Sequence, residues 1–144
     1  MSPQKASPEK VMELWLKAVI AKLNAAAGTV HLRENDGLRL AAAVNIPPPV
    51  QQVVEWVPNG KGMAGLAMQR DEPVQTCNLQ EDTTGNVKLG AKAVDAHAAI
   101  AIPVHTPTGE IRGVVGIAFM EEREITAAEV AEMTRAVSDM PQAV

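Results

Sequence analysis

Apolar residues recur at helical spacing near the start of the chain and predict a long amphipathic helix over residues 8–27. Ser7 is a suitable N-cap, and Gly28 is expected to end the helix because glycine readily adopts the conformation that follows a last turn. The apolar positions cover two neighbouring faces, which is more than packing against one sheet requires. We therefore expect part of this helix to be buried against a partner chain, with Leu16 and Ile20 as candidates for partner-facing residues.

Alternating apolar and polar residues next predict two antiparallel hairpins. In the first hairpin, residues 29–33 and 38–45 flank an Asp-Gly step, which is a strong turn signal. In the second hairpin, residues 98–105 and 111–120 flank a turn formed by residues 106–109. Four strands are therefore expected to pair with their neighbours in sequence.

Short helices are predicted between and after these strands. A run of prolines precedes one short helix over residues 50–56, and a glycine turn precedes another over residues 63–69. The last helix is expected over residues 126–140, because Thr126 and Glu129 have the spacing of a capping box.

The stretch between the two hairpins is less regular. Residues 74–78 are typical of a short strand, whereas residues 79–95 are polar and contain glycine, so they are predicted to be the most mobile segment. No repeat or linker interrupts the chain. Residues 1–144 are therefore expected to form one domain, with its core over residues 9–140.

The composition is that of an ordinary globular protein with one hydrophobic core. The 144 residues are 47% hydrophobic and 21% charged, near the averages of about 45–50% and about 25%. No apolar run approaches the roughly 20 residues that span a bilayer, and no signal peptide is expected. The sole cysteine, Cys77, favours a reducing cytoplasm, because disulfides accumulate in oxidising compartments.

Charge and aromatic content argue against a nucleic-acid partner. The net charge is −4, whereas a protein that binds the phosphate backbone needs a basic face. Only 2% of the residues are aromatic, which removes the stacking platforms that bind single strands. Neither nucleic acid nor a membrane is therefore an expected partner.

Residues 60–65 match the dinucleotide-binding pattern G-x-G-x-x-G, but their surroundings do not fit it. A buried strand should precede these glycines and a long helix should follow, whereas Pro58 and Asn59 precede them and the helix is short. Two interpretations remain open. The N–H groups of residues 62–65 can bind an anion or a carbonyl oxygen, or the glycines serve the turn alone.

The sequence shows no pattern of catalytic or metal-binding residues. The three histidines lack metal-ligand spacing, and Cys77 has no second cysteine beside it, which is typical of a buried structural thiol. The only serines lie in the terminal segments, so a serine hydrolase has no nucleophile. We therefore predict that the protein is not an enzyme.

His97 has the strongest case of the histidines for a role in binding. Strand alternation places His97, Ala99 and Ala101 on one face of their strand and a bulkier apolar set on the other. The bulky set should face the core, which leaves His97 above small alanines with room for a ligand. A protonated histidine there would favour an anion.

Several short motifs follow one another in a definite order along the chain: Val57-Pro58-x-Gly60-x-Gly62-x-x-Gly65, Glu72-Pro73-Val74, Asn78-Leu79, Ala101-Ile102-Pro103-Val104, Gly113-Val114-Val115-Gly116 and Ile125-Thr126. With the order of elements, this series resembles the GAF domain family over residues 9–140. The resemblance implies an α+β fold in which a six-stranded antiparallel sheet carries helices on both sides. It also implies a small-molecule pocket under the short helix, dimerisation through the terminal helices, and a sensory or regulatory role.

Differences from better-known members of that family narrow the expected ligand. The cyclic-nucleotide signature has no convincing counterpart in this sequence, and the chain has almost no aromatic residues from which to build the cavity of a bilin-binding member. The free methionine sulfoxide reductases of the family use more than one redox cysteine, whereas this sequence has only Cys77. We therefore expect no haem, bilin or metal, and a small metabolite or anion as the ligand.

Two function classes follow from the sequence. The first is a cytoplasmic small-molecule sensor that signals through a homodimer, formed by the helices over residues 8–27 and 126–140, or through a separate signalling protein. The second is a ligand-free module for protein interaction or dimerisation. The candidate ligand-binding residues are Trp56, Gly62, Met63, Ala64, Gly65, Thr76, Asn78, His97 and Ala99.

Overall fold

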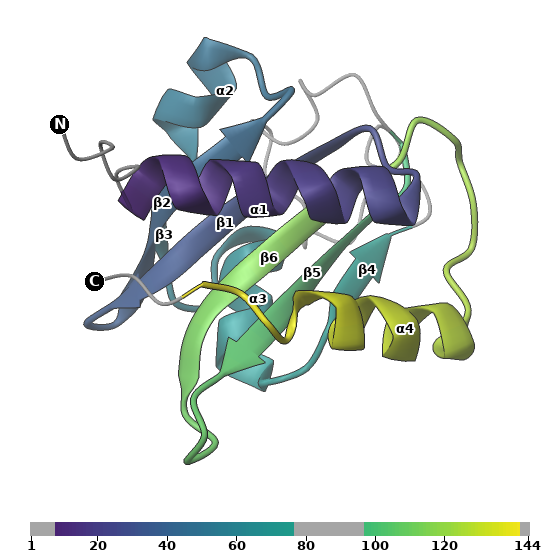
Figure 1. Cartoon of the computed structure of the whole chain (residues 1–144). Coiled ribbons are helices and arrows are strands. Elements are labelled where there is room, and N and C mark those ends of the chain that lie inside the picture. Colours follow the sequence, from purple (N-terminus) through teal and green to yellow (C-terminus); the bar gives the residue numbers. More distant parts are fainter. Residues whose placement is uncertain (1–7, 77–96, 142–144) are drawn as a thin grey trace, which may run out of the picture.

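The computed structural model describes residues 8–76 and 97–141, which form one six-stranded antiparallel sheet (Figure 1). The strands lie in the order β3-β2-β1-β6-β5-β4, so the two predicted hairpins, β1-β2 and β5-β6, meet at the centre of the sheet. The strands are β1 (Ala27–Glu34), β2 (Gly37–Val44), β3 (Trp56–Pro58), β4 (Val74–Thr76), β5 (Ala99–His105) and β6 (Ile111–Ala118).

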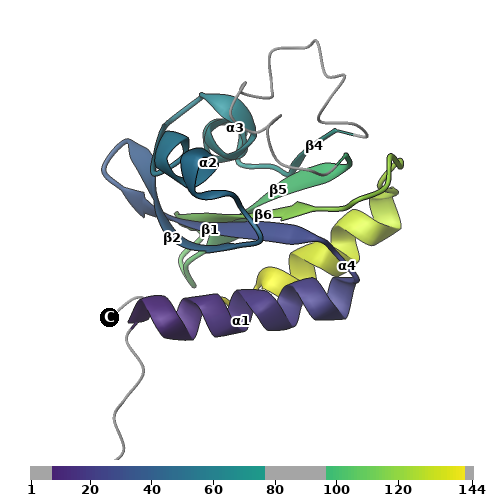
Figure 2. The ribbon, with the colours of Figure 1, turned by 90° about the horizontal axis from the view of Figure 1, so that it is seen from above.

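Helices cover both faces of the sheet. Helices α1 (Pro8–Leu23) and α4 (Ala127–Val137) lie against one face, and α2 (Pro48–Val53) and α3 (Gly62–Arg70) lie against the other (Figure 2). This arrangement confirms the predicted α+β fold. No helix in residues 8–76 or 97–141 is long and apolar enough to cross a membrane.

Helix α1 ends at Leu23, earlier than the predicted end at residue 27. Asn24 adopts the left-handed conformation with a φ of 56°. The N–H groups of Asn24 and Ala25 donate to carbonyls of the last helical turn at 3.2 and 2.9 Å, which is a Schellman cap. The predicted terminator was therefore wrong: Gly28 lies inside β1.

Both hairpin predictions are confirmed, with small differences at the turns. In the first hairpin Glu34 pairs with Gly37, and Asn35 takes a positive φ of 55°. Asparagine tolerates this region because its short polar side chain can bond locally. In the second hairpin Gly109 has a φ of 90°, which glycine adopts without steric cost.

The segment predicted as a helix over residues 50–56 divides into a helix and a strand. Helix α2 begins at Pro48 and ends at Val53, and Trp56 belongs to β3, where it pairs with Arg39. The Arg39 guanidinium lies 5.3 Å from the centre of the Trp56 ring. Pairing with β2 and this cation–π contact therefore override the local helical pattern.

The main hydrophobic core lies between the sheet and helices α1 and α4. As predicted, the bulky residues of β5 face this core, among them Ile100 and Ile102. Leu16 is 0% exposed and Ile20 is also buried, both against the sheet. These two residues therefore do not face a partner chain, because the protein's own sheet covers them.

The last helix and the short strand also agree with the sequence where they are described. Thr126 caps α4: the Glu129 N–H donates to Thr126 Oγ1 at 3.2 Å, and the Thr126 N–H donates to Glu129 Oε1 at 3.1 Å. Strand β4 ends at Thr76. Cys77, Asn78 and the predicted mobile segment of residues 79–95 lie outside the described residues.

Candidate ligand-binding pocket

Small side chains occupy the face of the central strands that turns away from the main core. Ala99 and Ala101 alternate with the isoleucines of β5, and Gly116 and Ala118 do the same on the neighbouring β6. Alternation by two residues places such a set on one face of a sheet. Because these side chains are short, the layer between the sheet and helices α2 and α3 is not filled.

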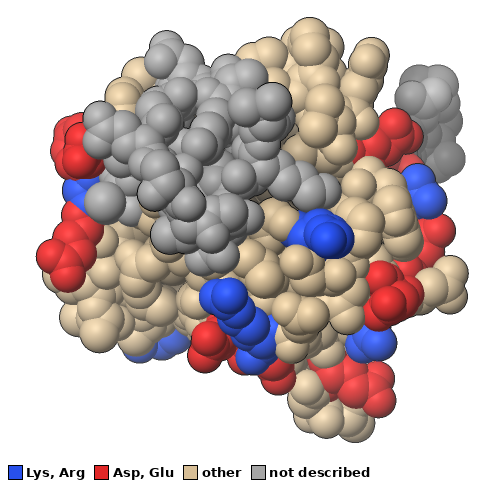
Figure 3. Space-filling view, turned by 180° about the vertical axis from the view of Figure 1, so that it is seen from behind, with Lys and Arg blue, Asp and Glu red and all other residues tan. Residues whose placement is uncertain are grey.

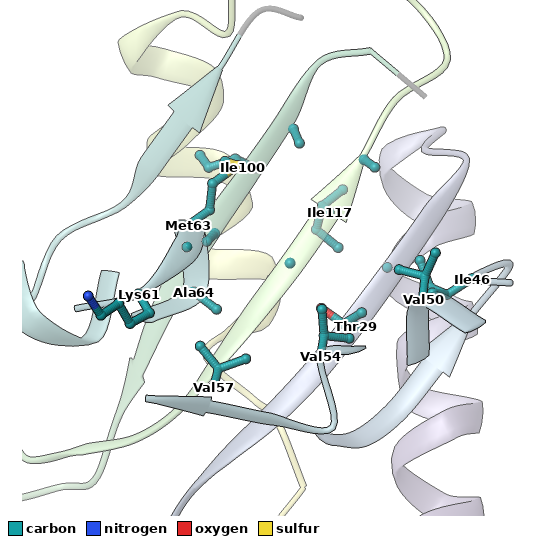
Figure 4. A pocket seen from close by; sticks show the side chains of 16 residues that line it. Thr29, Ile46, Val50, Val54, Val57, Lys61, Met63, Ala64, Ile100 and Ile117 are labelled. Carbon is teal, nitrogen blue, oxygen red and sulfur yellow. The ribbon is translucent and has the colours of Figure 1, made fainter. Parts of the chain in front are cut away.

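A cavity with a volume of about 130 Å³ lies in this layer, and we call it the pocket. Figure 4 shows Val50, Val54 and Val57 from the α2–β3 region at one side of it and Met63 and Ala64 of α3 at another. The residues that line it are Gly28, Thr29, Ile46, Val50, Val54, Val57, Lys61, Gly62, Met63, Ala64, Ala99, Ile100, Ala101, Gly116, Ile117 and Ala118.

Only two of the described lining residues carry polar side-chain atoms. Thr29 of β1 is one, and an added Cβ at Gly116 would lie only 2.7 Å from the Thr29 hydroxyl oxygen. Glycine at position 116 therefore leaves space for that hydroxyl. Lys61 is the other: it lies at one end of the pocket, but its side chain is exposed and its ammonium points away from the other labelled side chains (Figure 4). The pocket is thus an apolar chamber with one hydroxyl in its lining and an exposed lysine at its rim.

The glycine turn before α3 brings the helix close to β3. An added Cβ at Gly65 would lie 2.5 Å from the carbonyl oxygen of Pro58, and the Gly60 N–H donates to the Gly65 carbonyl at 2.8 Å. The close approach explains Gly65, and Gly60 has a φ of 84°, which favours glycine, so backbone geometry accounts for two of the glycines. Lys61, which directly precedes α3, forms no side-chain capping hydrogen bond, and the first N–H groups of a helix have no partner within the helix itself.

Four of the predicted site residues do line the pocket: Gly62, Met63, Ala64 and Ala99. Gly65 is buried directly behind them and supports the approach of α3 to β3. The sequence therefore indicated the helix start and the face of β5 that line this pocket.

Three other predicted residues do not line the pocket. His97 lies before β5, where its Nδ1 is 2.8 Å from the Met120 carbonyl oxygen. Trp56 belongs to β3 next to the lining residue Val57, and strand alternation turns its side chain to the opposite face. Thr76 ends β4 at the sheet edge. The predicted pairing of His97 with the α3 amides is therefore not formed by the described residues, and Asn78 lies outside them.

Sequence reasoning missed His31, which supports one wall of the pocket. His31 on β1 is only 3% exposed, and its Nε2 donates to the carbonyl oxygen of Val54 at 2.8 Å. Val54 itself lines the pocket. The hydrogen bond joins residues 23 positions apart, so no local sequence pattern predicts it. The one available signal is strand alternation, which places Thr29 and His31 on the same face of β1.

The described residues offer no ready metal site, and the charge around the pocket is mixed. No group of three or more potential metal-ligating side chains gathers within residues 8–76 and 97–141. Figure 3 shows the face that carries α2 and α3, where basic and acidic side chains are interspersed around an uncharged area beside the grey residues.

The sequence matches the family model described as GAF domain over residues 5–144. The match covers almost the whole chain, and the fold agrees with it, so the protein belongs to the GAF domain family. At the level of sequence, no curated protein matches the chain.

Solved structures with the same fold come from several kinds of protein. The GAF domain of a phosphoenolpyruvate-protein phosphotransferase from Coxiella burnetii has a TM-score of 0.72 and 19% identity, covering 94% of this chain and 83% of that one. The corresponding Acinetobacter domain has a TM-score of 0.71 and 16% identity, covering 95% and 83%. A type II free methionine-R-sulfoxide reductase from Thermoplasma acidophilum has a TM-score of 0.67 and 16% identity, covering 93% and 97%. At these identities the likeness shows the fold alone, which the GAF domain of a phosphotransferase and a reductase share.

Proposed function

We propose that this GAF domain is a regulatory module that binds a small molecule in the pocket between the sheet and helices α2 and α3. The pocket itself carries the proposal. An apolar cavity of about 150 Å³ in another protein binds benzene, so a chamber of about 130 Å³ has room for a small ligand. Lys61 at the rim and the first N–H groups of α3 supply polar groups at one end of this apolar chamber.

A ligand in the pocket would act on the segment between α2 and β3. Val54 lines the pocket, and its carbonyl oxygen accepts the hydrogen bond from His31 of β1. A bound molecule would therefore contact a segment that this hydrogen bond anchors to the sheet. Any ligand that binds only this arrangement stabilises it by mass action. The signal then passes to a second copy of the chain or to a separate signalling protein.

Exposed apolar residues on α1 support the second copy as the recipient of the signal. Val11 is 41% exposed and Leu14 is 51% exposed, and Ala18 and Ala21 are exposed on the same side of the helix. We call these four residues the α1 stripe. Their spacing of three, four and three residues is that of a helix-pairing seam. The stripe equally suits the alternative function of a dimerisation module without a ligand.

We further propose that the protein works without catalysis and in the cytoplasm. The whole sequence contains one cysteine, Cys77, and a lone thiol suits a reducing compartment. The reductases that share this fold need a second redox thiol by the family resemblance. Turnover of free methionine sulfoxide that disappears in Cys77→Ser would contradict the non-catalytic role.

Native mass spectrometry of the purified protein, followed by thermal melting with a panel of metabolites, tests the binding function. A ligand at about 100 times its Kd adds about 2.7 kcal/mol of stability, which raises the melting temperature. Ala99→Leu fills the pocket and should abolish both the co-purified mass and the thermal shift. The matched control is Ala128→Leu on the exposed surface of α4, which should change neither.

The absence of any bound mass and of any thermal shift in the wild-type protein would favour the ligand-free module. Equal shifts in the wild-type protein and Ala99→Leu would place the binding outside the pocket.

A further inference from the structure

We infer that the pocket takes a short aliphatic carboxylate, with a branched hydrocarbon body in the chamber and its carboxylate at Lys61. This inference rests on the proposed binding function and names its ligand class. Three features of the lining lead to it: its size, its lack of aromatic side chains and its one-sided charge.

The size of the chamber limits the buried part of the ligand. Benzene, with its six carbon atoms, occupies an engineered cavity of about 150 Å³. The pocket measures about 130 Å³, so it accommodates a ligand of about six to eight non-hydrogen atoms. A branched five-carbon acid falls in this range, whereas a nucleotide or a tetrapyrrole does not.

The chemistry of the walls favours a saturated hydrocarbon body. The chamber is surrounded by the branched side chains of Val50, Val54 and Val57, the flexible Met63 and the methyl group of Ala99. None of the described lining residues is aromatic, so a flat ring finds no stacking partner. Burial and close packing against aliphatic walls stabilise a bound hydrocarbon body of similar shape.

Lys61, at one end of the pocket, has the only charged side chain among the described lining residues. Lys61 lies at the rim, where its ammonium points outward and its flexible four-carbon stem can turn toward a ligand at the opening. No described lining residue is an aspartate, glutamate, asparagine or glutamine. No ion pair or side-chain hydrogen bond of Lys61 is formed within the described part of the chain. A carboxylate therefore finds a charged partner, whereas an ammonium group would lose its water with only the uncharged Thr29 hydroxyl as a side-chain acceptor among the described lining residues.

The lining residues that would contact the carboxylate and the hydrocarbon body lie at different parts of the pocket. Lys61 directly precedes α3, whose first residues Gly62, Met63 and Ala64 line the same edge of the pocket. Ala99 and Ala118 line the sheet side, and Val50 lies on α2. A carboxylate at Lys61 thus leaves the hydrocarbon body over the alanines and against the valines.

Isothermal titration with three nearly isosteric probes tests the inference. Isovalerate has the branched body and the carboxylate, isovaleramide replaces the charge by a neutral amide, and valine adds an ammonium group to isovalerate. We expect isovalerate to bind at least about tenfold more tightly than either of the others, because a charge-assisted hydrogen bond is stronger than a neutral one. In Lys61→Gln the preference over isovaleramide should fall to about twofold or less. Lys22→Gln, the same change on α1 across the sheet, should keep the full preference.

The outcomes separate this inference from the proposed function. Equal or tighter binding of isovaleramide, or of valine, overturns the carboxylate and leaves the binding function standing. A preference unchanged in Lys61→Gln also overturns it. A third outcome is that none of the three probes binds, while another metabolite raises the melting temperature of the wild-type protein but not that of Ala99→Leu. In that case the ligand class is wrong and the pocket is still a binding site.

Discussion

Gly65 illustrates how a single missing side chain shapes the pocket. The backbone of α3 passes so close to the end of β3 that a Cβ at this position would lie 2.5 Å from the Pro58 carbonyl oxygen. Backbone atoms cannot move aside as a side-chain tip can. The glycine pattern that looked like a nucleotide fingerprint therefore serves, at this position, the contact between a helix and a strand.

We predict that Gly65→Ala destabilises the protein by about 1–3 kcal/mol, because overpacking against the backbone forces α3 away from β3. Urea denaturation monitored by circular dichroism measures the loss. Since α3 lines the pocket, the same variant should bind any pocket ligand more weakly. Gly109→Ala is a useful comparison, because its added Cβ meets no atom within 4 Å and only its φ of 90° is strained. A stability equal to that of the wild-type protein in Gly65→Ala would contradict the close approach.

Helix α4 shows how far local chemistry can define an element. Its start is a reciprocal capping box between Thr126 and Glu129, and Arg123 forms an ion pair with the same glutamate. Met133 and Val137 then bury one face in the main core. Both the cap and the apolar spacing lie within the helix sequence, so the prediction needed no distant residue.

Removing the cap should weaken the whole domain measurably. We expect Thr126→Ala to cost about 1 kcal/mol of the free energy of unfolding, since two N–H groups lose their partner or their orientation. Thr126→Ser keeps the hydroxyl and should remain within a few tenths of a kcal/mol of the wild-type value. Urea midpoints of the two variants decide the matter, and equal losses in both would show that the hydroxyl does not act as the cap.

At the scale of the whole molecule, α1 has two separate apolar faces. One contains Leu16 and Ile20 and packs against the sheet, and the other is the α1 stripe. The over-wide apolar pattern of the sequence thus has a structural basis. The residues first expected to face a partner belong to the inner face, because the sheet lies there.

We predict that the protein is a homodimer and that Leu14→Glu converts it to a folded monomer. Leu14 is 51% exposed, so a charge there leaves the core intact, whereas in an apolar seam it would bury an unpaired carboxylate, which is strongly unfavourable. Light scattering gives the mass, and circular dichroism verifies the fold. Val53→Glu, at an exposed apolar residue of α2 on the opposite face, should remain dimeric. A monomeric wild-type protein would overturn the dimer, and unfolding of Leu14→Glu would show that this residue belongs to the core.

The sequence by itself determined the features that depend on near neighbours. Both hairpins follow from alternation and turn residues, α4 follows from its cap, and the small face of β5 follows from Ala99 and Ala101. These signals are local, because a period of two or a cap at fixed spacing is complete within a few residues. The family resemblance supplied the remaining outline of the sheet.

Only the tertiary structure decided which residues meet at the pocket. Thr29, Val54 and Lys61 come from three separate segments, and their meeting depends on the order of strands and on where α2 and α3 lie. The same long-range packing made Trp56 a strand residue and left His97 outside the pocket. Periodicity tells which face of an element a side chain occupies, but the free energy that selects what covers that face comes from contacts far apart in the chain.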